Sequence, residues 1–188
     1  EAAVDALLAG EAIPVPPSWD GILVTGEAAP PLRGADLLDG GTSFDLETTR
    51  GAPTIVLTAP PLRDDHEAIC GVTTAIRDAV RRVGLAQAEL GGDATIVIVP
   101  DDASDADAWR ALVREAGVTA AGITVVAAET PTYRALLTYG RDAQAAARLC
   151  NQMPGILVLD ARGRVAHILV GELPDAAALV SLVRELVD

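Results

Sequence analysis

Five short hydrophobic runs stand out after residue 50 of the chain. Each is four to six residues long, rich in Val and Ile, and bounded by Gly, Pro or polar residues, a pattern typical of buried β-strands. The runs cover residues 54–58, 95–99, 123–126, 156–159 and 165–170. The last two are joined by the turn sequence Asp160-Ala161-Arg162-Gly163. We therefore expect five core strands, the last two consecutive in the chain.

Between these runs, apolar residues recur every three or four positions, which predicts amphipathic helices. The first helix follows residue 66 and ends at Gly84 or at Gly91-Gly92, with the second running from a Ser104 cap to about residue 116. Further helices are expected at about 131–147 and 179–186. The predicted fold class is therefore α/β, with a mixed central sheet flanked by helices.

The first third of the chain carries weaker signals. Residues 1–35 contain a Pro-rich passage and are expected to form an N-terminal extension and lead-in, with the main domain at 36–188. The turn Asp39-Gly40-Gly41 separates Leu37-Leu38 from residues 43–46, which predicts a small hairpin. A chain of 188 residues, half of them hydrophobic, suits one globular domain with a substantial core.

Charge and hydropathy exclude several classes of function. The formal net charge is -13 and every basic residue is arginine, which argues against nucleic acid or an anionic membrane as the partner. No apolar run approaches the roughly 18 residues that a membrane-spanning helix needs, so no span is expected in this sequence. Because the chain begins at Glu1 rather than Met, we expect that an upstream segment was removed; a signal or anchor segment is one interpretation, and it favours an extracytoplasmic protein.

Candidate chemistry centres on His66 and Cys70. If both lie on the first helix, their i, i+4 spacing places an imidazole and a thiol roughly 5–6 Å apart on one face. A second cysteine, Cys150, allows three interpretations: one disulfide, two ligands at a shared site, or two inert buried thiols.

Four phrases of the sequence carry a family resemblance over residues 28–187. They are GTSFDLETTRGAPTIVL, HEAICGVTTAI, ATIVIVPDD and MPGILVLDARGRVAHILVG. The layout resembles the thioredoxin-like superfamily, nearest the branch with the Sco/SenC copper proteins and the peroxiredoxin-like and TlpA-like thiol proteins. The resemblance implies a three-layer thioredoxin-like fold, with Pro154 in the place of the proline that is usually cis and lies against the active-site thiols.

The same resemblance implies a divergent site. Cys70 aligns with the second cysteine of the Sco-like Cys-x-x-x-Cys motif and His66 replaces the first, while the distant histidine ligand falls near Gln152 or Met153. A copper site would then use His66, Cys70 and either Cys150 or Met153, a soft ligand set suited to copper(I). The family frame also brings Cys70 and Cys150 together, which implies a redox disulfide shaped by Pro154.

Other interpretations stay open. The thioredoxin Cys-x-x-Cys motif is absent, and Glu67 stands where peroxiredoxins carry threonine, so neither ordinary thioredoxin nor peroxidase activity is expected. The predicted function is thiol redox or copper(I) handling with a protein acceptor as partner. The alternative is a catalytically silent thioredoxin-like module that binds another protein, with Cys70 acting as a small hydrophobic residue.

Overall fold

The computed structural model describes residues 25–60, 62, 72–100, 103, 105–118, 122–128, 154–170 and 173–187. In these residues, one seven-stranded sheet has the order β2-β1-β5-β4-β3-β6-β7. The strands are β1 (Arg33–Asp36), β2 (Ser43–Asp45), β3 (Thr54–Ala59), β4 (Thr95–Pro100), β5 (Ile123–Ala128), β6 (Gly155–Leu159) and β7 (Val165–Val170). All five predicted core strands are confirmed.

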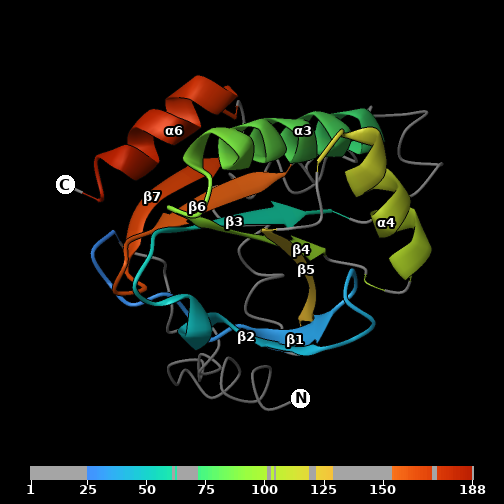
Figure 1. The fold of residues 1–188 in the computed structure, drawn as a ribbon, viewed down its shortest axis with the longest axis horizontal. Helices are drawn as coiled ribbons and strands as arrows, with labels where there is room; N and C mark the ends of the chain where they lie inside the picture. The colour runs from blue at the N-terminus through green and yellow to red at the C-terminus, as the bar shows by residue number, and fades with distance from the viewer. Residues whose placement is uncertain are drawn as a thin grey trace, which may run out of the picture.

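The sheet is mixed, as the element order predicted. Strands β3, β4 and β5 are parallel neighbours, whereas β6 runs antiparallel to β3 and β7 antiparallel to β6. At the other side, β1 pairs antiparallel with both β5 and β2. Figure 1 shows β5 curving away from the central strands toward the β1–β2 pair.

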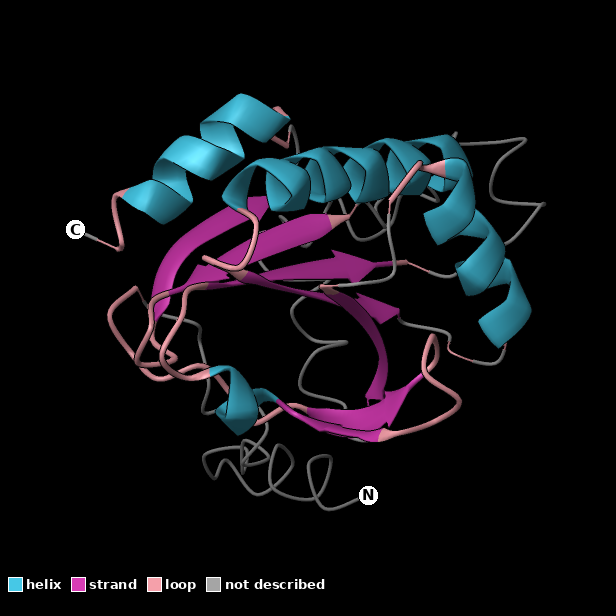
Figure 2. Cartoon of the chain, in the orientation of Figure 1, coloured by secondary structure: helices cyan, strands magenta, loops and turns pink. Residues whose placement is uncertain are grey.

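The α-helices that the structure describes cover one face of the sheet. Helices α3 (Val72–Leu90), α4 (Ala106–Glu115) and α6 (Ala176–Arg184) all lie on the same side, with the β1–β2 pair and the short 3-10 helix η2 (Leu46–Thr49) on the opposite side (Figure 2). No helix within the described ranges is both long and apolar enough to cross a bilayer.

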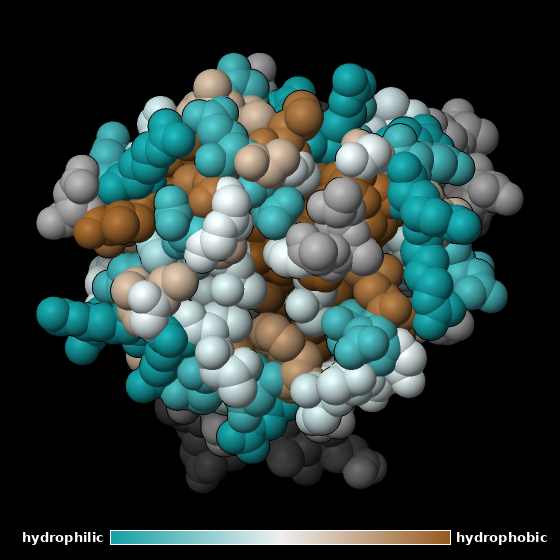
Figure 3. Space-filling model, in the orientation of Figure 1, coloured by the Kyte–Doolittle hydropathy of each residue, from teal (hydrophilic) through white to brown (hydrophobic). Residues whose placement is uncertain are grey.

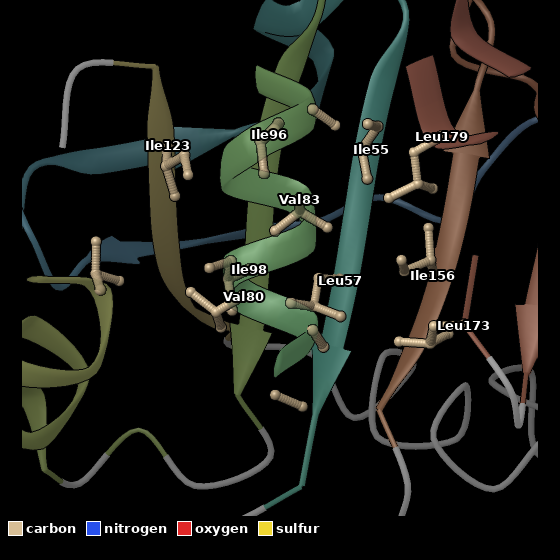
Figure 4. Close-up of a cluster of buried hydrophobic side chains, with 14 of the residues drawn as sticks. Ile55, Leu57, Val80, Val83, Ile96, Ile98, Ile123, Ile156, Leu173 and Leu179 are labelled. Atoms are coloured by element: carbon tan, nitrogen blue, oxygen red, sulfur yellow. The ribbon is translucent and has the colours of Figure 1, made fainter. Parts of the chain in front are cut away.

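The hydrophobic core has two parts, one on each face of the sheet. On the helical face, Ile55 and Leu57 of β3 point with Ile96 and Ile98 of β4 toward Val80 and Val83 of α3 (Figure 4). On the other face, a second cluster includes Val56, Val97, Leu157 and Leu32. Residues buried on both faces explain why these strands read as continuous apolar runs. On the face shown in Figure 3, polar and neutral side chains cover most of the surface, with apolar side chains visible between them.

The structure corrects the predicted hairpin. Its first strand is Arg33–Asp36, so Leu37 and Leu38 lie in the connecting turn, where they pack partly buried against the helical-face cluster. Leu46 begins η2 rather than ending the second strand, because the Asp45 side chain accepts a hydrogen bond from the Glu47 N–H and caps that helix. Apolar residues in a turn and in a strand give the same sequence signal here.

Asp45 also fastens β2 to β1. Its carboxylate accepts a hydrogen bond from the Arg33 Nε at 2.8 Å, directly across the strand pair. The hydrogen bond from the Glu47 backbone N–H, followed by the nearby Arg33 guanidinium, holds the pKa of Asp45 below its ordinary value.

Of the two ends predicted for the first helix, Gly84 and Gly91-Gly92, the structure confirms the second, and it corrects the predicted cap of α4. Helix α3 continues through Gly84 and ends before Gly91, whose φ of +61° suits glycine. Gly84 lies inside the helix and lets Val118 approach it closely, since a Cβ at this position would clash with a Val118 methyl carbon. Helix α4 is capped by Asp105, not Ser104, since the Asp105 carboxylate accepts the Ala108 N–H at 2.9 Å.

Some predictions fall on residues that the structure does not describe. They include the helix expected at 131–147, the start of the first helix before residue 72, and most of the lead-in at 1–35. The division of the chain at residue 35 therefore stays a prediction.

Candidate functional site

The candidate site lies where β3 ends and β6 begins. Because the two strands are antiparallel, the last residues of β3 stand beside the first residues of β6, with Thr58 opposite Gly155. Pro60 follows β3 and Pro154 precedes β6, and both prolines are buried. The segment that leads to His66 and Cys70 therefore leaves the sheet at the place where the segment carrying Cys150 and Met153 returns to it.

Thr58 ties the two strand ends together through its side chain. It is only 2% exposed, and its hydroxyl donates a hydrogen bond to the Gly155 carbonyl oxygen at 3.1 Å. This bond satisfies a polar group that would be costly to bury alone. Gly155 fits closely over it, since a Cβ there would lie 3.2 Å from the Thr58 hydroxyl oxygen. Thr58 thus fixes the backbone immediately after Pro154 against the end of β3.

Sequence reasoning assigned no role to Thr58. The sequence feature that could have indicated its role is a hydroxyl side chain at the end of a mainly apolar run, Thr54-Ile55-Val56-Leu57-Thr58. Threonine is common in strands, however, and only the cross-strand partner distinguishes a buried hydrogen-bonding hydroxyl from a surface one.

Of the predicted site residues, Pro154 is the one that the structure describes. It lies buried at the start of β6, the position predicted for it. His66, Cys70, Cys150 and Met153 lie outside the described residues, so their mutual distances stay predictions. The expected cis Met153–Pro154 bond also stays a prediction because it involves Met153. No cluster of three or more His, Cys, Asp or Glu side chains suited to a metal occurs among the residues that the structure describes.

Comparison with known proteins bears on the fold. No family model and no curated protein sequence matches the chain. Among solved structures, a thiol:disulfide interchange protein of the thioredoxin family from Chlorobium tepidum superposes with a TM-score of 0.60 at 18% identity, covering 86% of this chain and 96% of that one. A peroxiredoxin-like protein from Aquifex aeolicus gives 0.59 at 18% identity, covering 87% and 88%.

A third similar structure is a secreted Mycobacterium tuberculosis disulfide oxidoreductase homologous to DsbE. It gives a TM-score of 0.56 at 15% identity and covers 82% of this chain and 95% of that one. The chain therefore has a thioredoxin-like α/β fold, as predicted, in the form shared by DsbE-like and peroxiredoxin-like structures.

Proposed function

We propose that the protein carries out extracytoplasmic thiol–disulfide exchange through Cys70 and Cys150. One observation carries the proposal: the Thr58–Gly155 pair, next to Pro154, holds the end of β3 beside the start of β6. Cys70 follows β3 in the sequence, and Cys150 precedes β6. Cys70 is 12 residues beyond Thr58, and Cys150 is five residues before Gly155. The similar structures, which include a thiol:disulfide interchange protein and a secreted disulfide oxidoreductase, support the same chemistry and location.

The proposed reaction transfers two electrons to a disulfide of a client protein. The Cys70 thiolate attacks one sulfur of the client disulfide, forms a mixed disulfide and releases the first client thiolate. The Cys150 thiolate then attacks the Cys70 sulfur, which releases the second client thiolate and leaves a Cys70–Cys150 disulfide. The two protons given up by the cysteines end on the client thiols, and the reverse sequence oxidises a client dithiol.

The two-step scheme is tested by trapping the mixed disulfide. We expect Cys150→Ser to accumulate a covalent adduct with a disulfide-bonded peptide, because no second thiol is present to resolve it. Non-reducing electrophoresis with mass spectrometry measures the adduct, and dithiothreitol should release it. Wild-type protein under the same conditions should release reduced peptide without accumulating adduct. Equal absence of adduct and of product in both proteins would contradict the proposal.

Copper(I) handling is the second candidate function for the same two segments, the one that follows β3 and the one that precedes β6. His66, Cys70, Cys150 and Met153 supply imidazole, thiolate and thioether groups, a donor set that favours copper(I). If it binds, copper would be held by three of these side chains. The test is a titration of the reduced protein with copper(I) against a competing chelator. A copper(I) affinity of the wild type that is no higher than that of Cys70→Ser would exclude this candidate.

A catalytically silent module that binds a protein partner is the remaining alternative. Under that alternative, the wild type would neither exchange disulfides nor bind copper(I), and Cys70→Ser would leave partner binding nearly unchanged.

A further inference from the structure

A groove lies between α3 and α4. Its volume is about 340 Å³, within the range of roughly 300–1,000 Å³ that is common for binding pockets. The apolar part of its lining includes Leu62, Ala111 and Leu112, and the charged part consists of Arg77, Asp105 and Glu115. Leu62 is two residues beyond the buried Pro60 that follows β3, so the groove adjoins the segment that leads to Cys70.

We propose that this groove docks the polypeptide client, and that it favours a segment with a basic residue close to the reactive cysteine. This inference rests on the proposed thiol–disulfide exchange and names its substrate class. The apolar lining would hold the backbone and an apolar side chain of an extended client segment. The acidic side chains of the groove would form an ion pair with the basic side chain of that segment.

Charge on the groove is the reason for the basic preference. The lining holds two carboxylates, those of Asp105 and Glu115, and one guanidinium, that of Arg77, in a chain whose net charge is -13. The Arg77–Glu115 ion pair is long, at 3.4 Å, and its side chains are 45% and 59% exposed. Exposed pairs of this kind contribute little, so a client arginine can compete with Arg77 for Glu115 at little cost.

Two pairs of variants separate docking from general effects. Ala111→Arg places a long cationic side chain in the groove, and its control, Ala88→Arg, makes the same charge change on an exposed part of α3. Ala88 is 11 residues beyond Arg77, which is about 16 Å along a helix. Glu115→Gln removes one groove carboxylate, and its control is Glu89→Gln, because Glu89 forms a similar exposed ion pair with Arg184 at 3.3 Å.

Rates are measured with three disulfide substrates. Two are peptides that differ only in an Arg or a Glu beside the cysteine, and the third is hydroxyethyl disulfide, which is too small to need the groove. We expect Ala111→Arg to slow the Arg peptide at least about tenfold and Glu115→Gln to slow it about threefold, as expected for rim charges. Both control variants should stay close to wild type, and all variants should reduce hydroxyethyl disulfide at the wild-type rate.

The outcomes distinguish the two proposals. If Ala111→Arg and Glu115→Gln match their controls with the Arg peptide while hydroxyethyl disulfide is reduced normally, docking in the groove is wrong and thiol exchange stands. Equal wild-type rates for the Arg and Glu peptides would also overturn the basic preference. If the wild type does not react with hydroxyethyl disulfide, the proposed function fails and the docking proposal fails with it. Because the Glu115 side chain is exposed, Glu115→Gln should fold, and it tests docking in the groove even if Ala111→Arg does not fold.

Discussion

Replacing Cys70 with serine is expected to lower the rate of disulfide exchange by at least about a hundredfold, because a serine hydroxyl does not replace the attacking thiolate. The loss should appear with peptide disulfides and with hydroxyethyl disulfide alike, since the change removes the nucleophile rather than the docking surface. The measurement is the initial rate of substrate reduction under a fixed excess of dithiothreitol, corrected for the reaction of dithiothreitol alone.

The matched control for Cys70→Ser is Cys150→Ser. It keeps the proposed nucleophile, so it should still form the first mixed disulfide while losing its intramolecular resolution. Circular dichroism and thermal unfolding establish that both variants are folded. If the two variants lose the same fraction of the first-step rate, or if Cys70→Ser retains the wild-type rate, Cys70 is not the nucleophile.

The largest expected effect on stability comes from Trp109→Ala. Trp109 of α4 is 1% exposed and belongs to the helical-face cluster that joins α4 to the sheet and to α3. Truncating a buried tryptophan removes its transfer free energy and leaves a cavity, so we expect the free energy of unfolding to fall by about 3–5 kcal/mol. That is a large fraction of the roughly 5–15 kcal/mol typical of a whole domain. Urea unfolding followed by circular dichroism measures it.

Arg110→Ala is the control on the same helix. Arg110 forms an exposed i, i+3 ion pair with Asp107 at 2.7 Å, and such pairs contribute about 0.5 kcal/mol or less. The expected difference between the two variants is therefore several-fold. A Trp109→Ala loss no greater than that of Arg110→Ala would show that α4 is not anchored through this side chain.

The core of the fold was predictable because burial leaves a plain periodic signal. Each central strand is buried on both faces, so residues such as Val56 and Leu57 follow one another as an unbroken apolar run. The hairpin was placed less well because Leu37 and Leu38 are apolar yet lie in a turn. Gly84 was expected as a possible helix end, but its role depends on the approach of Val118, a contact between residues 34 positions apart.

The candidate site was predictable only in part. Pro154 was expected at the entrance to β6 from the family resemblance, and it lies there. The Thr58–Gly155 hydrogen bond joins residues 97 positions apart, and the groove depends on how α3 packs beside α4. Such features follow from tertiary packing, which no local pattern encodes. The pairing of Cys70 with Cys150 likewise stays a prediction.

The most direct test of thiol–disulfide exchange is to identify the bonded cysteines after mild oxidation. The reduced protein is treated with a limiting amount of oxidant, its remaining thiols are alkylated, and it is digested without reduction for mass spectrometry. We predict one cross-linked peptide pair joining Cys70 to Cys150, which dithiothreitol converts back to two free cysteines. Two alkylated, unbridged cysteines in the folded protein would contradict the proposed chemistry.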